Sequence, residues 1–182
     1  MKFLPADIIL DINERHDPYS VIKRWVLGNP FEHVRMFYGS GIASTEIPLF
    51  YESVGRGVIL TQAHDFIGKK VAVMRLDVGY QEAIPDIIGN AFHIATQIQS
   101  KYDYMCVPGI IIPRLICEKL GIPLPLKYQR NPLMVCSEAV AEPFWRAGVP
   151  ILPQDIVPLP GDFFTSPILH LVEYAPISKD WL

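Results

Sequence analysis

Apolar and polar residues alternate over several short stretches in the first half of the chain. This two-residue period, rich in β-branched and aromatic residues, predicts half-buried β-strands. The strands expected from it are Ala6–Ile12, Glu32–Tyr38, Leu49–Val54, Gly57–Thr61 and Lys70–Leu76. Glycine-rich turns at 39–41 and 55–57 separate neighbouring strands and predict antiparallel hairpins or a meander.

A helical period replaces the alternation in the second half. Apolar residues recur at helical spacing over Tyr80–Lys101, which predicts a long amphipathic helix bent near Pro85. Three further helices are expected over residues 17–28, over Ile110–Leu120 and from Asn131-Pro132 onward. Their signals are an N-cap residue followed by proline, or a closing glycine.

The proline-rich stretch Pro150–Pro167 is expected to wrap over the surface before a last strand, Ile168–Tyr174. The strands are therefore grouped early and the helices mostly late. Such grouping predicts an α+β fold rather than alternating βαβ units. A length of 182 residues, without an internal repeat or linker, predicts one domain over 1–182.

Composition narrows the classes of function. Half of the residues are hydrophobic and the net charge is -3, with no basic run, so no nucleic-acid binding is expected. The N-terminus lacks the unbroken apolar core of a signal peptide, and no apolar run is long enough to span a membrane. These patterns favour a cytoplasmic or particle-associated protein.

Three cysteines without CxxC spacing suggest neither a disulfide framework nor a zinc site, so free thiols and no metal are expected. Cys106 and Cys117 lie in apolar surroundings and are interpreted as structural. Cys136, in NPLMVCSEAV, is expected on the first turn of the helix that Asn131-Pro132 begins. A helix N-terminus favours a thiolate and offers backbone donors to an oxyanion, so Cys136 is the candidate nucleophile.

A cysteine nucleophile needs a base and a group that orients the base. His33 lies on an expected strand, and Glu52 follows it by one hairpin, which brings same-face side chains to about 5 Å. His170, also on a strand, is the main rival to His33. The remaining histidines are His16, His64 and His93.

Four segments in this order, EHVRMFYG, LFYESVGRGV, YDY and VCSEAVAEPFWRAG, resemble the circularly permuted branch of the NlpC-type papain-like cysteine peptidases. The subgroup they are most similar to is the YiiX-like one. A late stretch, LPQDIVPLPGDFFTSP, also resembles that family, so the likeness runs from about residue 5 to residue 172. Glu32 and Ser53 depart from it, standing where serine and alanine are usual, and Ala6-Asp7 replaces an opening Gly-Asp.

The resemblance implies a permuted papain-like fold, in which a small antiparallel barrel-like sheet packs against helices. It implies Cys136 as nucleophile, His33 as general base and Glu52 as orienting acid, with no cofactor. Tyr102 would supply a hydroxyl near the oxyanion or the substrate terminus. The implied activity is hydrolysis of an amide through a thioester, with bacterial cell-wall peptides as the substrate class and an N-acyl lipid amide or ester as another possibility in the superfamily.

Two other functions remain as alternatives. The fold could serve as a catalytically silent structural or interaction protein of a bacterial or phage assembly, docking through the proline-rich C-terminal region. A metal-dependent phosphohydrolase built from His16-Asp17 and His64-Asp65 is disfavoured, because these pairs are expected in strand-rich or loop regions rather than on a helical bundle.

Overall fold

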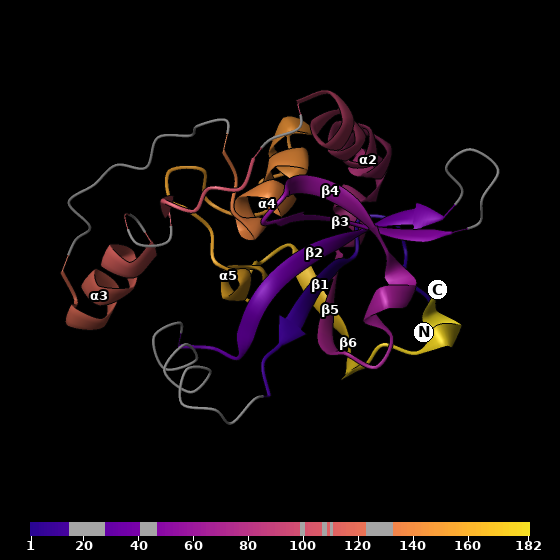
Figure 1. The fold of residues 1–182 in the computed structure, drawn as a ribbon, viewed down its shortest axis with the longest axis horizontal. Coiled ribbons are helices and arrows are strands. Elements are labelled where there is room, and N and C mark those ends of the chain that lie inside the picture. Colours follow the sequence, from indigo (N-terminus) through magenta and orange to yellow (C-terminus); the bar gives the residue numbers. More distant parts are fainter. Residues whose placement is uncertain (15–27, 41–46, 99–100, 107–108, 110, 123–132) are drawn as a thin grey trace.

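Six strands form one sheet, shown in Figure 1. The computed structural model describes residues 1–14, 28–40, 47–98, 101–106, 109, 111–122 and 133–182. The strands are β1 (Ile8–Ile12), β2 (Phe31–Ser40), β3 (Pro48–Val54), β4 (Gly57–Gln62), β5 (Lys70–Leu76) and β6 (Leu169–Pro176). Their order is β4-β3-β2-β1-β5-β6, and each neighbouring pair is antiparallel. All six expected strands are confirmed, with ends that differ by two residues at most.

Helices surround this sheet. The α-helices are α2 (Ile84–His93), α3 (Ile112–Leu120), α4 (Cys136–Arg146) and α5 (Pro160–Phe164). Shorter helical segments are η1 (Ala63–Phe66), η2 (Val78–Ala83), η3 (Ile94–Ile98) and η5 (Lys179–Trp181). The α+β class is therefore confirmed, as a six-stranded antiparallel sheet packed against helices.

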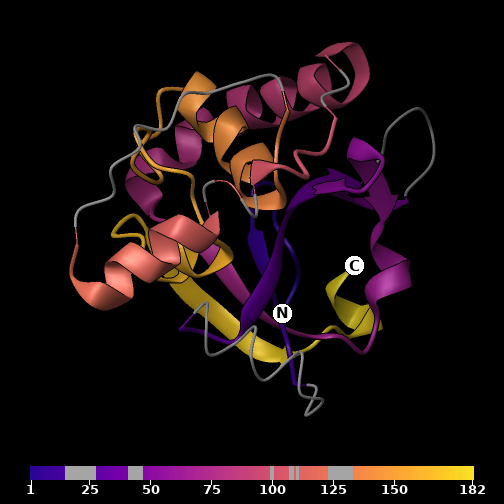
Figure 2. The same ribbon diagram turned by 60° about the vertical axis from the view of Figure 1, so that its left-hand side comes forward.

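The two faces of the sheet carry different cores, because alternate residues of a strand point to opposite faces. Val34, Met36 and Tyr51 join the larger core, in which α4 packs on β2 and β3, and α2 packs on α4. On the other face, Phe37 and Phe50 belong to a second cluster. Phe3 and Trp181, near the two chain ends, close that cluster, and Figure 2 shows both ends inside the curve of the sheet.

The helix expected over Tyr80–Lys101 is divided rather than continuous. Pro85 lies in the first turn of α2, where its missing N–H costs nothing, so the proline starts this helix instead of bending it. A 3₁₀ segment precedes α2 and a π-helical turn follows it. The helix α3 agrees with expectation and ends at Gly121 in a left-handed conformation.

The expected start of α4 at Asn131-Pro132 is wrong. Asn131 and Pro132 lie outside the described residues, but 133–135 are not helical, and Val135 is extended at the N-cap. The helix begins at Cys136, so Cys136 does lie in the first turn, as expected. Pro143 lies inside α4, and the helix continues through it to Arg146.

The proline-rich stretch Pro150–Pro167 contains the short helix α5, which the sequence did not predict. Asp162 caps this helix by accepting a hydrogen bond from the Leu159 backbone N–H at 2.8 Å. Several apolar side chains of the proline-rich stretch, including Ile151 and Val157, are buried. The helix expected over 17–28 lies outside the described residues, apart from Gly28. Among the described residues, no helix combines the length and the apolar character needed to cross a bilayer.

Candidate active site

The candidate site lies where strands β2 and β3 separate. Their ladder ends at the Met36–Tyr51 pair, whereas β3 continues to pair with β4 as far as Val54. From Met36 back toward its start at Phe31, β2 pairs only with β1. The N-terminus of α4 contacts the sheet at this divergence, since α4 packs on both β2 and β3. Side chains from two strands and one helix can therefore meet there.

Side-chain hydrogen bonds fix the start of α4. Glu138, in the first turn, accepts a hydrogen bond from the Val135 backbone N–H at 3.0 Å. Ser53 of β3 donates its hydroxyl to the Met134 carbonyl at 2.9 Å, and Ser137 donates to the Pro158 carbonyl at 2.6 Å. These bonds hold the residues on both sides of Cys136 against the sheet and the C-terminal segment.

His33 and Glu52 form a short, partly buried contact at the centre of the site. His33 Nε2 lies 2.7 Å from Glu52 Oε2, and the side chains are 22% and 3% exposed. Thr61 of β4 donates its hydroxyl to the other carboxylate oxygen, Oε1, at 2.6 Å. Because Nε2 is used by Glu52, Nδ1 is the ring nitrogen that remains for the hydrogen bond between His33 and the Cys136 thiol.

The electrostatics of the three groups support one another. Burial disfavours the Cys136 thiolate, but the charge on His33 and hydrogen bonds from His33, Val34 N–H and Ser137 N–H outweigh it and lower the pKa of the thiol. Burial also disfavours the imidazolium, yet the Cys136 charge and the bonds to Cys136 and Glu52 raise the pKa of His33 to about 9. A thiolate–imidazolium pair is the favoured form.

The third member of the arrangement remains ionised. Burial alone would raise the pKa of Glu52, but the hydrogen bond with His33, the charge of Arg35 and the Thr61 hydroxyl lower it to about 2. An ionised Glu52 accepts a hydrogen bond from Nε2–H and thereby orients the ring with Nδ1 toward the sulfur. This is the arrangement that nucleophilic catalysis by cysteine requires.

Tyr102 lies near the thiol, close enough for the Cys136 charge to act on its hydroxyl. Tyr102 packs against a small buried cluster that contains Val135, the residue directly before Cys136. Burial and the nearby Cys136 charge raise the pKa of Tyr102 to about 12, so its hydroxyl stays protonated and able to donate. The structure thus brings together all four residues that were predicted from the sequence.

The other described cysteines and histidines lie in different surroundings. Burial raises the pKa of Cys106 to about 12, which makes its thiol unreactive at neutral pH. His170 pairs with Asp77 at 2.8 Å on an exposed part of the edge strand β6. His64 and His93 are exposed, and His16 lies outside the described residues.

Sequence reasoning missed the groups that support the triad. Arg35 and Asp11 form a buried ion pair beside Glu52, and Thr61 and Ser53 anchor Glu52 and the cysteine segment. A signal was present for the first two, since Asp11 interrupts the apolar strand β1 and Arg35 stands between the apolar residues Val34 and Met36. Such residues are seldom buried without a partner.

An open antiparallel sheet with helices packed on it defines an α+β protein. Among solved structures, this fold is shared by a chain described as "metalloprotein yiiX from Escherichia coli O157:H7, DUF1105". The two are 19% identical with a TM-score of 0.53, over 97% of this chain and 100% of that chain. At that identity the likeness concerns the fold alone. The sequence matches no protein-family model and no curated protein.

Proposed function

We propose that this protein is a cysteine hydrolase of the permuted papain-like type, with Cys136 as nucleophile, His33 as general acid and base, and Glu52 as the orienting carboxylate. The observation that carries the proposal is the position of His33. One ring nitrogen lies 2.7 Å from the buried Glu52 carboxylate, and the other is left for a thiol at the first residue of a helix. The YiiX-like fold and the order of the sequence motifs agree with this assignment.

The first half of the reaction is acyl transfer to sulfur. The Cys136 thiolate attacks the carbonyl carbon of an amide, and the carbonyl electrons move onto oxygen. Backbone N–H groups at the start of α4 and the Tyr102 hydroxyl stabilise this oxyanion. The His33 imidazolium then gives its Nδ1 proton to the leaving nitrogen, the C–N bond breaks, and a thioester remains on Cys136.

The second half is hydrolysis of the thioester. Neutral His33 takes a proton from water, and the resulting hydroxide attacks the thioester carbonyl. The C–S bond breaks, the acid product leaves, and the thiolate–imidazolium pair is restored. Glu52 keeps the same ring orientation in both halves, so His33 can act first as acid and then as base.

The substrate class follows from the sequence resemblance. Peptide stems or crosslinks of bacterial cell walls are the amides expected for this branch, and an N-acyl amide of a lipid is the related alternative. The His33 side chain is partly exposed, which gives such a substrate access to the triad.

The description of YiiX as a metalloprotein raises the question of whether the same residues suit a metal ion. Glu52 bonds Nε2 of His33, and Cys136 bonds the same ring, so both groups are engaged with the imidazole rather than with a common point. Among the described residues, no group of three or more His, Cys, Asp or Glu side chains could hold a metal. The donor set of this site therefore does not fit a metal ion.

The test is hydrolysis of purified bacterial peptidoglycan and of an N-acyl amide. The readout is the release of new amino groups. The wild type should release them from one of these substrates. Cys136→Ala should abolish the release while leaving the fold intact, and Cys106→Ala should retain it. An unchanged rate in Cys136→Ala would exclude the mechanism.

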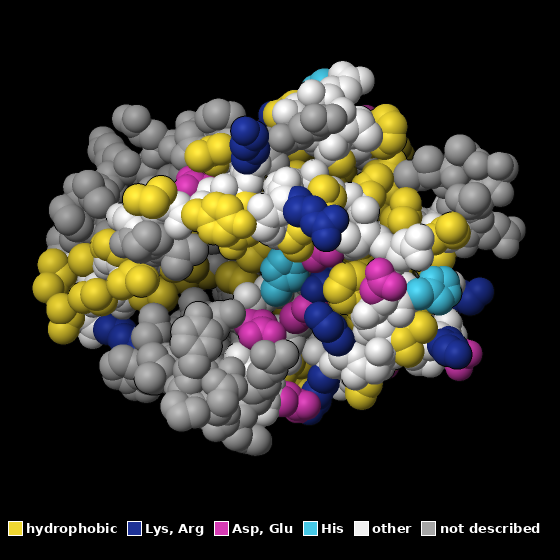
Figure 3. Space-filling model, in the orientation of Figure 1, with side chains coloured by type: hydrophobic (Ala, Val, Ile, Leu, Met, Phe, Trp, Pro, Cys, Tyr) yellow, Lys and Arg dark blue, Asp and Glu magenta, His cyan; other side chains and the backbone are white. Residues whose placement is uncertain are grey.

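The second candidate function is a silent interaction protein. One observation favours it: α3 exposes Ile112, Ile116 and Leu120, which lie four residues apart on one side of the helix. Hydrophobic side chains extend over this part of the surface in Figure 3. Iodoacetamide labelling at mildly acidic pH separates the two functions, because only an activated thiolate reacts there.

A further inference from the structure

Arg35 occupies an unusual position behind the triad. Its side chain is 2% exposed, although a buried guanidinium is unfavourable unless its charge is compensated. Arg35 Nη2 donates a hydrogen bond to Asp11 Oδ2, and Arg35 Nε lies 3.7 Å from Glu52 Oε2. The guanidinium carbon also lies 3.7 Å from the centre of the Phe66 ring, a cation–π contact.

These contacts extend the triad into a row of alternating charges. Its members, in order, are the Cys136 thiolate, the His33 imidazolium, Glu52, Arg35, Asp11 and Lys69. The row begins on α4, crosses three strands and ends on the turn before β5. Each charge therefore has opposite charges as its neighbours, which is how several ions can be buried together.

Glu52 Oε2 is the shared point of the row. The same oxygen contacts His33 Nε2 at 2.7 Å and faces Arg35 Nε at 3.7 Å. Since both cations attract one oxygen, the positive charge of Arg35 weakens the hold of Glu52 on the His33 proton. Asp11 opposes this effect, because its carboxylate draws Arg35 toward β1.

We propose that Arg35, held in place by Asp11, is a positioning residue that fixes the Glu52 carboxylate and limits how tightly His33 retains its proton. The inference rests on the proposed function, in which His33 must release a proton to the leaving nitrogen and then accept one from water. A histidine bound too strongly to Glu52 and the thiolate would seldom be neutral at pH 7, and hydrolysis of the thioester would slow.

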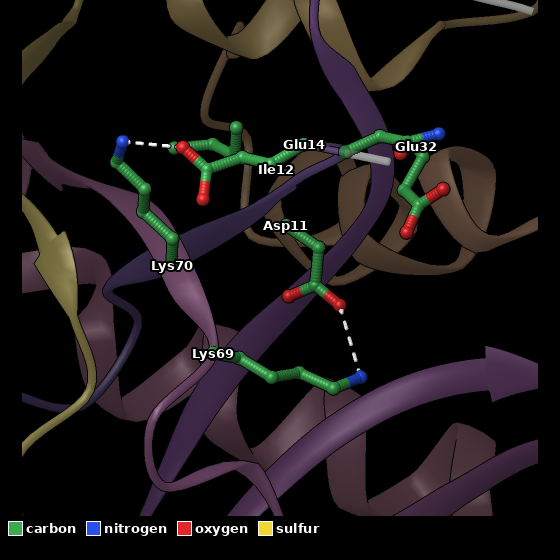
Figure 4. A pocket seen from close by; sticks show the side chains of 7 residues that line it. Asp11, Ile12, Glu14, Glu32, Lys69 and Lys70 are labelled. Atoms are coloured by element: carbon green, nitrogen blue, oxygen red, sulfur yellow. Dashed lines mark hydrogen bonds and ion pairs between the residues drawn. The ribbon is translucent and has the colours of Figure 1, made fainter. Parts of the chain in front are cut away.

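The outer end of the row is open to solvent. Asp11 and Lys69 line a pocket of about 190 Å³, and Figure 4 shows the Lys69 ammonium directed at the Asp11 carboxylate. Lys69 is 52% exposed, so salt screens its charge more than that of Arg35. The charges of Arg35 and Asp11 are consequently screened least by solvent, so this pair has the larger electrostatic effect on Glu52.

The experiment measures the pKa of His33 by NMR titration of its ring signals, assigned by comparison with His33→Gln. A Cys136→Ala background lets the imidazole titrate without the thiol. The charged groups facing His33 are then Glu52 on β3, Arg35 on its own strand and Asp11 on β1, with Lys69 behind Asp11.

The row predicts shifts of opposite sign. Arg35→Gln removes a positive charge and should raise the pKa of His33 by about one unit. Asp11→Asn removes a negative charge and frees Arg35 to turn toward Glu52, so it should lower that pKa. Arg35→Lys keeps the charge and should shift it less than Arg35→Gln.

A purely structural ion pair would behave differently. Both Arg35→Gln and Asp11→Asn would lower the melting temperature and leave the pKa of His33 in place, and that result would overturn the proposal. Should Arg35→Gln fail to fold, Asp11→Asn decides alone, since an unchanged or raised pKa contradicts the row. The titration needs no substrate, so absence of hydrolysis by the wild type would reject the proposed function without altering this result.

Discussion

His33 Nε2 lies 2.7 Å from Glu52 Oε2, and this contact determines which ring nitrogen of the imidazole is left for the cysteine. An ionised carboxylate can only accept, so Nε2 carries the shared proton and Nδ1 is directed to the thiol. The two residues come from strands whose ladder has already ended at Met36 and Tyr51. The divergence of β2 and β3 thus makes room for α4 and its first residue.

Replacement of Glu52 by glutamine should remove the charge that stabilises the imidazolium while keeping the side-chain size. We expect the Cys136 alkylation rate at pH 6 to fall at least about tenfold, since a lost charge partner of this kind shifts a pKa by a unit or more. Site-resolved mass spectrometry after iodoacetamide treatment measures the rate.

Thr61→Val is the matched comparison for Glu52→Gln. It removes one hydrogen bond to Glu52 Oε1 but leaves the carboxylate and its contact with His33. Its effect on alkylation should therefore be in the same direction and smaller. Equal rates in wild type and Glu52→Gln would show that Glu52 does not support the thiolate–imidazolium pair.

Glu138 should make stability depend on pH above the usual range of a carboxyl. Burial, together with Asp103 and Glu142, raises the pKa of Glu138 from 4.5 to about 7, despite the hydrogen bond from Val135. The folded state binds this proton more tightly than the unfolded state. Its contribution is therefore fully present below pH 4.5 and is lost as the pH rises through 7.

Glu138→Gln keeps an acceptor for the Val135 N–H and removes the titration. Between pH 4.5 and pH 8 the wild type should lose roughly 3 kcal/mol of unfolding free energy more than this variant does. Urea unfolding at both pH values provides the measurement, with the exposed Glu82→Gln as the control for net charge. A pH dependence shared by wild type and Glu138→Gln would assign the effect to other groups.

Ser53→Ala should affect both stability and the site. It leaves the buried Met134 carbonyl without its 2.9 Å donor, at a cost of about 1–3 kcal/mol. Because Met134 lies two residues before Cys136, alkylation of Cys136 should slow as well. Ser166→Ala removes a similar bond, to the Ile151 carbonyl at 2.7 Å, and should lower stability alone. Identical alkylation in both variants would mean that Ser53 only stabilises the fold.

Tyr102→Phe tests the hydroxyl assigned to the oxyanion. Loss of one oxyanion donor should lower kcat by about 10²-fold and leave KM nearly unchanged, because the bond forms mainly in the transition state. Tyr104→Phe is the control, since the Tyr104 hydroxyl donates to the Gly55 carbonyl instead. A raised KM at constant kcat would place Tyr102 in substrate binding.

The strands and the His33–Glu52 contact were predictable because local patterns determine them. Alternation assigns a face to each strand residue, and the Gly55-Arg56 turn joins β3 to β4 in register. The antiparallel pairing of β2 with β3 brings Glu52 near His33. The order of motifs in the chain placed Cys136 beside them, although it lies more than 80 residues away from Glu52 in sequence.

The start of α4 and the charge row were not predictable from local patterns, because distant residues determine them. Cys136 begins the helix at the point where Glu138 caps Val135 and Ser53 of β3 holds Met134. Likewise, Arg35 is buried through contacts with Asp11, on a different strand. An N-cap residue followed by proline reports only the local preference for starting a helix and contains no information about these tertiary bonds.

The most direct test of the account is the rate of Cys136 alkylation as a function of pH, in wild type and in His33→Ala, with each cysteine assigned by mass spectrometry. If Cys136 and His33 form a thiolate–imidazolium pair, Cys136 reacts with an apparent pKa well below the ordinary thiol value of about 8.5, and His33→Ala abolishes this low value. A Cys136 that reacts no faster than Cys117 at any pH, with or without His33, would contradict it.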